Sequence, residues 1–355
     1  MVVVLETLKT DILDARATDR AGLPLAPGQA RMRVDRVALT ANTVTYAVVG
    51  ARIGYWRFWP CEATDEGRGL VPAWGFATCV ESRSDHVAAG ERFYGCWALA
   101  EELAVDARPA PDGFIDAAPR REGLAPFYAR YHRAPFGEAE AEARRALLQP
   151  LAMTGWLLTD YIEAHDRFGA ERAILSSASS KTSIALAQAL KEAGIPALGL
   201  TSAGNEAFVR GLGSYREVDL YDALPDALDR VPSVFVDMAG SEKVRRAVHE
   251  ALSGGLLKAS IGVGAARWRE LGAAPDIPDP QPEFFFAPAW AQKRTEDWGG
   301  PDFARRLNEA ADRRVEASRD WLTVDVRGVA ELEAAWAEAA AGRQAPASGV
   351  VIAFR

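Results

Sequence analysis

Residues 172–200 read RAILSSASSKTSIALAQALKEAGIPALGL, and this stretch decides the fold. It opens with a short apolar run, Ala173 to Leu175, that is typical of a buried strand. The small residues Ser176 to Ser183 predict a tight turn, and apolar residues at helical spacing follow, until a glycine and a proline end the helix. A second apolar run completes the stretch. The pattern therefore predicts a strand, a turn, a helix and a second strand, which together form one βαβ unit.

The turn has the position of an anion site but lacks glycine. Unpaired N–H groups point outward from the start of a helix, and dinucleotide-binding folds place a pyrophosphate there. Against the pattern G-x-G-x-x-G the turn offers Ala178, Ser180 and Ser183, and a looser spacing of small residues uses Ser177 instead of Ala178. Glycine would supply positive φ and close approach to the pyrophosphate. Serine keeps the small size and can donate to a phosphate oxygen, and Lys181 adds a positive charge. A nucleotide-binding turn and a merely capped helix start both remain open.

Composition limits the class of protein. The chain has 355 residues, of which 49% are hydrophobic and 25% charged, so it is long enough for two cores. A formal net charge of -8 argues against a nucleic-acid or anionic-membrane surface. Three cysteines, Cys61, Cys79 and Cys96, provide no disulfide framework and no metal-binding spacing, and they favour a reduced cytoplasm. The opening MVVVLETLKT predicts a first strand rather than a signal peptide.

The first part of the chain is rich in short strands. From Gly28 to Val105, glycines and prolines separate the runs ARMRVDRVAL, NTVTYAVVG, LVPAWGFATCVES and RFYGCWALAEELAV, which predict an antiparallel, barrel-like β domain. Aromatic residues gather between Tyr46 and Trp59, where they either form core or line a flat apolar cleft. We expect residues 107–149 to form an inserted segment, and Leu151 to His165 to form a helix.

The part after the βαβ unit alternates strands and helices. This alternation predicts an α/β fold with a doubly wound parallel sheet, in which ligands bind at the carboxyl ends of strands. Ala239 and Gly240 follow one such strand, and Gly262 and Val263 end another, so we expect both pairs to lie at the same edge as the serine turn. A helix from Leu332 to Ala341 and a last strand return to the first domain.

The order of these pieces resembles the medium-chain dehydrogenase/reductase superfamily, in its zinc-independent, quinone-oxidoreductase-like branch. A bacterial subfamily with a similar Ser-Lys turn is the nearest resemblance, and it implies no substrate. The residues that carry the resemblance are Asn42-Thr-Val-Thr-Tyr46, Pro150-Leu-Ala-Met-Thr154-Gly, Ala187-Gln188-Ala-Leu-Lys191, Leu212-Gly213-Ser214, Val236-Asp237-Met-Ala-Gly240 and Ser260-Ile-Gly262. The resemblance implies a GroES-like barrel domain over residues 1–149 and 276–355 and a Rossmann nucleotide-binding domain over residues 150–275. The zinc ligands of the superfamily have no counterpart, so we expect no metal.

The cofactor follows from the end of the second strand. Thr201 and Ser202 stand there without an Asp or Glu to hold a ribose 2′-hydroxyl, which disfavours NAD and favours the 2′-phosphate of NADP(H). The superfamily usually places Lys or Arg a few residues later, where this chain has Asn205, so Lys181 is the candidate cation. A cation at a helix N-terminus is unfavourable, so we expect Lys181 to bind an anion. A solvated lysine is the alternative.

We expect an NADPH-dependent oxidoreductase that reduces a carbonyl or an activated C=C of a fairly apolar small molecule. Tyr46 is the candidate proton donor, because a phenol holds its proton at neutral pH, and a core tyrosine is the alternative. By resemblance only, Asn42 and Thr154 are orienting groups. The predicted cofactor-binding residues are Thr154, Ser177, Ser179, Ser180, Lys181, Thr182, Thr201, Ser202, Ala239, Gly240, Gly262 and Val263.

The sequence also predicts binding partners and leaves two other functions open. Besides a small apolar substrate we expect a homodimer that pairs through an edge strand near Ala259 to Val263. One rival is a reductase-like protein without turnover that binds a ligand or a partner. Another, a phosphotransferase that uses Ser180, Lys181 and Thr182, would need a magnesium-binding acid such as Asp237.

Overall fold

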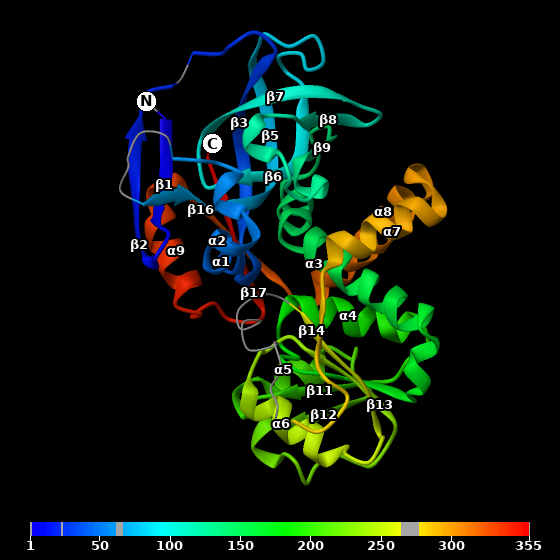
Figure 1. Ribbon diagram of the computed structural model, residues 1–355. Helices are drawn as coiled ribbons and strands as arrows, with labels where there is room; N and C mark the ends of the chain where they lie inside the picture. Colours follow the sequence, from blue (N-terminus) through cyan, green and yellow to red (C-terminus); the bar gives the residue numbers. More distant parts are fainter. Residues whose placement is uncertain (1, 23, 62–66, 264–276, 355) are drawn as a thin grey trace. The chain divides into compact units, whose positions relative to one another are not determined.

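The computed structural model describes residues 2–22, 24–61, 67–263 and 277–354. The chain divides into two compact units, Met1–Leu147 with Leu322–Arg355 and Leu148–Trp321 (Figure 1). Residues 277–321, which the sequence analysis assigns to the first domain, thus belong to the second unit. Asp160 on α3 (Ala139–Ala164) explains this placement, because it accepts hydrogen bonds from Trp290 Nε1 at 2.7 Å and Arg294 Nε at 2.6 Å, both on α7 (Ala287–Trp298).

A closed six-stranded barrel forms the core of the first unit. Its strands follow the order β3-β5-β6-β9-β8-β7, and pairing of β3 with β7 closes it. The strands are β3 (Gln29–Leu39), β5 (Pro72–Ser82), β6 (Arg92–Ala98), β7 (Glu102–Ala110), β8 (Gly113–Asp116) and β9 (Arg130–Arg133). The predicted barrel is confirmed. Residues 107–149 are not an insertion into it, because they supply β8 and β9, which are needed for closure.

The two ends of the chain complete the first unit. β17 (Ser348–Ala353) pairs antiparallel with β3, and β16 (Thr323–Gly328), a strand that the sequence analysis does not predict, runs parallel to β17. A separate sheet has the order β2-β1-β4, with bounds β1 (Val2–Leu8), β2 (Asp11–Arg20) and β4 (Arg68–Leu70). α9 (Leu332–Ala340) lies beside β2, where Trp336 Nε1 donates to the carbonyl oxygen of Ile12 at 2.8 Å (Figure 1). This contact protects an otherwise open strand edge.

One predicted strand of the first unit is wrong. The run NTVTYAVVG forms α1 (Ala41–Val48), followed by the short α2 (Gly50–Ile53). Thr40 caps α1, because its hydroxyl accepts from Thr43 N at 3.3 Å while Thr40 N donates to Thr43 Oγ1 at 3.2 Å. This reciprocal capping box outweighs the strand preference of the β-branched residues in the run.

A six-stranded parallel sheet forms the core of the second unit. Its order is β12-β11-β10-β13-β14-β15, which is the order 3-2-1-4-5-6 of a doubly wound dinucleotide-binding sheet. The strands are β10 (Arg172–Leu175), β11 (Ala197–Thr201), β12 (Glu217–Leu220), β13 (Ser233–Asp237), β14 (Leu257–Val263) and β15 (Glu283–Phe285). The predicted fold class is confirmed. The strand from Ala259 to Val263, however, is not an edge, because β15 pairs with it on its outer side.

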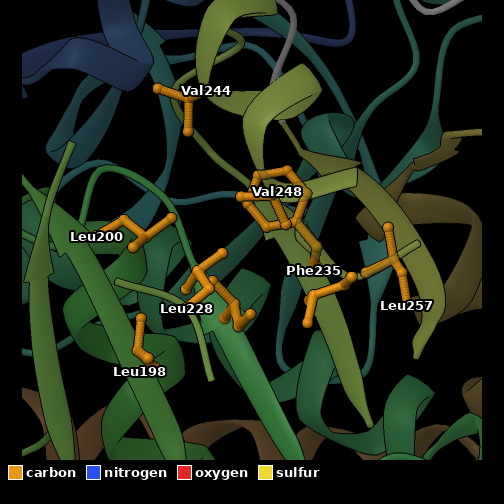
Figure 2. Close-up of a cluster of buried hydrophobic side chains, with 9 residues drawn as sticks. Leu198, Leu200, Leu228, Phe235, Val244, Val248 and Leu257 are labelled. Carbon is orange, nitrogen blue, oxygen red and sulfur yellow. The ribbon is translucent and has the colours of Figure 1, made fainter. Parts of the chain in front are cut away.

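The helices of this unit are α4 (Lys181–Glu192), α5 (Glu206–Gly211), α6 (Glu242–Ala251) and α8 (Gly300–Ala317), together with α7 and the second half of α3. On one face α6 packs against the strands through Val244 and Val248, which contact Phe235 and Leu200 in a buried apolar cluster (Figure 2). The described helices include none with the length and apolar character of a membrane span.

Close backbone contact fixes α3 against α4. α3 runs through Pro150 without a break, so the helix predicted to begin at Leu151 begins at Ala139 instead. A Cβ added at Gly155 would lie 2.7 Å from Leu186 N and 2.8 Å from the carbonyl carbon of Ala185. Only glycine allows this approach, which places α3 one turn from the start of α4.

Candidate functional site

The serine turn joins β10 to α4 in the second unit, as predicted. Ser177 takes a left-handed conformation with φ of 52°, so it performs the backbone role that a fingerprint glycine would have. Ser180 is the N-cap of α4 with an ordinary φ of -74°, and its hydroxyl accepts from Ser183 N at 3.2 Å. Of the three small positions, only that of Ser177 therefore needs the conformational freedom of glycine.

The serine hydroxyls mostly bond inside the turn. Ser180 Oγ donates to Ser183 Oγ at 3.0 Å, and Ser183 Oγ donates to the carbonyl oxygen of Ser176 at 3.0 Å. Ser176 Oγ donates to Asp237 Oδ1 at 2.8 Å and accepts from Ala239 N at 2.9 Å, which ties the turn to the end of β13. These hydroxyls stabilise the turn in place of glycine. The sequence suggested that they donate to a phosphate, but several of them already donate to groups of the protein.

The start of α4 lies at the carboxyl edge of the parallel sheet. The first intrahelical bond is Ile184 N to the carbonyl oxygen of Ser180, so the N–H groups of Lys181 and Thr182 precede it. Both side chains are half-buried. Burial lowers the pKa of the Lys181 ammonium to about 8, and an anion beside it would stabilise the charged form.

The end of β11 borders the turn. Ala178 N donates to the carbonyl oxygen of Leu200 at 3.0 Å. Thr201, the last residue of β11, is buried, and Ser202, which follows it, is exposed. Asn205 Nδ2 donates to Ser179 Oγ at 3.1 Å and so bridges the two loops.

Two tyrosines at the turn were missed by the sequence analysis. The Tyr221 hydroxyl, just after β12, accepts from Ser177 N at 2.7 Å. The Tyr215 hydroxyl donates to the carbonyl oxygen of Ala178 at 2.8 Å. Their only signal in the sequence is an aromatic residue on either side of the strand EVDL, which core packing explains equally well. Together they hold the strained residue and its neighbour from the β12 side.

The remaining strand ends share this edge of the sheet. Gly240 has φ of 62°, and its N–H donates to Asp237 Oδ1 at 2.9 Å. Gly262 pairs with Asp237 in the parallel ladder, and Val263 follows it. Asp237 is buried and also accepts from Arg245 Nε at 3.2 Å, so its carboxylate is committed to protein partners. This removes the acid that the phosphotransferase alternative requires.

Thr154 lies on α3 immediately before Gly155, beside the first turns of α4. Its Oγ1 donates to the carbonyl oxygen of Pro150 at 3.0 Å. Among the described residues, no group of three or more His, Cys, Asp or Glu side chains is placed to hold a metal ion.

Tyr46 and Asn42 lie in the first unit and contact each other directly. Asn42 Nδ2 donates to the Tyr46 hydroxyl at 2.7 Å across one turn of α1, and Trp74 Nε1 on β5 donates to the same oxygen at 2.9 Å. Tyr55 and Tyr128 pack on Tyr46, with ring centroids at 4.7 and 5.9 Å, and their own hydroxyls lie 3.0 Å apart. Aromatic crowding between residues 46 and 59 therefore forms a buried cluster, which we call the tyrosine cluster.

Burial controls the acidity of the tyrosine cluster. It raises the pKa of Tyr46 well above its usual value of 10, although the hydrogen bonds from Trp74 and Asn42 act in the opposite direction. Burial likewise raises the pKa of Tyr55 to about 12 and that of Tyr128 well above 10. Each phenol keeps its proton at neutral pH. The two donors on Tyr46 leave its own O–H free to point elsewhere.

A family model described as a protein of unknown function (DUF2855) matches residues 37–345. The chain belongs to this family. No curated protein matches the sequence of this DUF2855 chain. Solved structures do share its fold. A structure described as a putative NADPH:quinone reductase from Mesorhizobium loti is 15% identical with a TM-score of 0.60, over 96% of this chain and 90% of that one.

Two further structures are similar to the DUF2855 chain. The yhdH oxidoreductase from Salmonella enterica in complex with NADP is 14% identical, with a TM-score of 0.57 and all of both chains covered. The CurK enoyl reductase is 14% identical, with a TM-score of 0.55 and 99% of both chains covered. These likenesses show that the DUF2855 chain shares the fold of these solved reductases.

Proposed function

We propose that the chain is an NADPH-dependent, zinc-independent oxidoreductase. The observation that carries this proposal is the serine turn, which meets the carboxyl edge of a 3-2-1-4-5-6 sheet and runs into a capped helix with Lys181 at its first position. Support comes from the shared fold, since similar structures are described as NADPH:quinone reductase and as an NADP complex.

The residues of the turn fit a dinucleotide. Ser177 adopts the left-handed conformation and Ser180 caps α4, so a pyrophosphate would lie at the N-terminal end of that helix. Thr201, Ser202 and Lys181 are the candidates for the 2′-phosphate, since the strand that ends at Thr201 carries no Asp or Glu. When bound, NADPH would supply the hydride.

The remaining predicted contacts follow from the shared edge of the sheet. We assign Ser179 and Thr182 to the phosphates, and the strand-end residues to the rest of the nucleotide. These are Thr154, Ala239, Gly240, Gly262 and Val263.

Tyr46 is the proposed proton donor. Its phenol is neutral at pH 7, and hydrogen bonds from Asn42 and Trp74 to its oxygen would stabilise the negative charge that appears as the proton leaves. Asn42 thereby orients the phenol. The substrate class that suits an aromatic surrounding is a fairly apolar small molecule with a carbonyl or an activated C=C. A cytoplasmic location suits three cysteines that form no disulfide.

The proposal includes a homodimer, but the strand at its contact is not the one that the sequence predicted. β15 now occupies the outer side of β14, so β15 is the edge that a second copy would extend. Light scattering at working concentration should give twice the mass of one chain, and a single-chain mass would contradict the dimer.

Substitutions at the turn test the function. Lys181→Ala should weaken NADPH by about 1.5–3 kcal/mol and leave NADH nearly unchanged, because a hydrogen bond to the 2′-phosphate is lost. Ser180→Gly should leave both nucleotides intact or improve them, since glycine at an N-cap costs only a few tenths of a kcal/mol. Equal weakening of both nucleotides by Lys181→Ala would place the lysine on the pyrophosphate instead.

The pH dependence gives a second test on the same residue. An ammonium with a pKa of about 8 loses its charge as pH rises through that value, so NADPH affinity should fall there and proton uptake should accompany binding. Lys181→Ala should abolish both effects. The rival, a protein of this fold without turnover, is favoured by the inward serine hydroxyls. It predicts no melting shift with either nucleotide.

A further inference from the structure

The backbone of the serine turn depends on two tyrosine side chains for part of its hydrogen bonding. Ser176, Ser177 and Ala178 each carry one N–H and one carbonyl group. Most of these groups pair with the neighbouring strands or within the turn, and their partners are the carbonyl oxygens of Val236 and Leu200, Ser183 Oγ and Ser180 N. In the described part of the chain, the remaining two, Ser177 N and the carbonyl oxygen of Ala178, pair only with tyrosine hydroxyls.

These two bonds enclose the strained residue of the turn. The Tyr221 hydroxyl accepts from Ser177 N at 2.7 Å, and the Tyr215 hydroxyl donates to the carbonyl oxygen of Ala178 at 2.8 Å. Between these two groups lies the backbone of Ser177, with φ of 52°. The strain of one left-handed residue other than glycine is similar in size to the stabilisation that one or two hydrogen bonds provide. The two tyrosines can therefore hold Ser177 in a conformation that it would otherwise rarely adopt.

A glycine on β11 makes room for Tyr215. A Cβ added at Gly199 would lie 2.8 Å from Tyr215 Cδ1 and 2.9 Å from Ala178 Cβ, which is closer than carbon atoms pack in proteins. The ring of Tyr215 also packs against a buried apolar cluster that consists of Ala178, Val209 and Val218. Packing and a hydrogen bond thus fix this side chain together. The glycine lies beside the turn, where it admits a tyrosine, rather than within the turn.

Both tyrosines keep the protonated form that these contacts use. Burial raises the pKa of Tyr215 well above its usual value of 10. Burial also raises the pKa of Tyr221, and the nearby Asp237 acts in the same direction, whereas the bond from Ser177 lowers it. Each phenol is therefore neutral at pH 7. The two hydrogen bonds persist across the neutral range.

We propose that Tyr215 and Tyr221 are positioning residues, which hold the glycine-free turn in the left-handed shape that a dinucleotide requires. Glycine serves this purpose in a dinucleotide fingerprint, because it adopts positive φ without strain. Without the tyrosines, Ser177 would relax toward negative φ, and the backbone beside the pyrophosphate would move. The effect on binding rests on the proposed function, whereas the restraint of the turn does not. Because the pyrophosphate is common to NADPH and NADH, both nucleotides should respond alike.

Titration calorimetry of the full chain with NADPH and with NADH tests the positioning role. Tyr221→Phe keeps the ring but removes the acceptor of Ser177 N, so it should weaken both nucleotides about 10-fold, and Tyr215→Phe should act in the same direction. Tyr161→Phe is the matched control, because the Tyr161 hydroxyl donates to Glu283 instead, at 3.0 Å, and both affinities should stay unchanged. Adding Ser177→Gly to Tyr221→Phe should restore both affinities, since glycine needs no restraint.

Amide hydrogen exchange of the nucleotide-free chain gives a readout that does not depend on the proposed function. Peptides that contain the turn should exchange faster in Tyr221→Phe, because Ser177 N loses its acceptor, and at the unmodified rate in Tyr161→Phe. If neither nucleotide binds the unmodified chain, the proposed function fails, and the exchange rates still decide whether Tyr221 restrains the turn. Unchanged exchange in Tyr221→Phe would overturn the proposal. So would a loss confined to NADPH, which would show that the phenol contacts the 2′-phosphate, or a failure of Ser177→Gly to restore binding.

Discussion

Replacing the serines of the turn one at a time with glycine separates the backbone requirement from the hydroxyl bonds. Ser177 has φ of 52°, Ser180 is an N-cap, and Ser183 is buried inside α4. A dinucleotide fingerprint would place glycine at such positions, but the structure predicts a different effect at each. The variants are Ser177→Gly, Ser180→Gly and Ser183→Gly.

The magnitudes follow from the contacts. At Ser177, glycine removes about 1–2 kcal/mol of left-handed strain from the folded state. It also raises the conformational entropy of the unfolded chain, which costs about 0.4–1 kcal/mol of stability. We therefore expect the free energy of unfolding to rise by roughly 0.5–1 kcal/mol. At Ser180 a cap is weakened by a few tenths of a kcal/mol. At Ser183 two hydroxyl hydrogen bonds are lost, at about 0.5–1.5 kcal/mol each, along with helix propensity, so a loss of about 2–3 kcal/mol is expected.

Urea denaturation at neutral pH measures the three effects. The midpoint should rise slightly for Ser177→Gly, fall slightly for Ser180→Gly and fall clearly for Ser183→Gly, with unchanged slopes. A destabilised Ser177→Gly variant would refute the strained conformation. A neutral Ser183→Gly variant would refute the inward hydroxyl chain.

Three other predictions concern packing, acidity and metal. Gly155→Ala should lower the melting temperature, because its Cβ would meet backbone atoms of Leu186, whereas Gly211→Ala, with nothing within 4 Å, should not. The contribution of Tyr46 to stability should be constant below pH 10 and fall above it, because burial raises the pKa of Tyr46 in the folded state and the unfolded chain releases that proton first. Alkaline denaturation of Tyr46→Phe should therefore show a shallower fall in stability above pH 10 than the unmodified chain. Turnover, assayed as NADPH consumption, should survive prior incubation with chelators, and a loss restored by added zinc would contradict a zinc-independent reaction.

The sequence predicts the second unit well because its signals are local. Apolar runs, small residues and helix stops mark β10, the serine turn and α4, and the strand ends Asp237 and Val263 follow from alternation alone. Parallel order then brings these ends to one edge without any further information.

Long-range pairing and local capping account for what the sequence analysis missed. A capping box at Thr40 decides that α1 is a helix, and hydroxyl geometry is not visible in residue types. β15 has only three residues, so its pairing with β14, which hides the expected edge, gives almost no periodic signal. The partners of Ser177 and Ala178, Tyr221 and Tyr215, lie 44 and 37 residues away, and only the folded chain brings them together.

Titration calorimetry of the unmodified chain with each nucleotide tests whether the serine turn binds NADPH in preference to NADH. The expected result is one site per chain that binds NADPH at micromolar concentration, and NADH more weakly by about 10-fold or more, the loss expected for a hydrogen bond to a charged group. Equal affinity for the two nucleotides, or no binding of either, would contradict it.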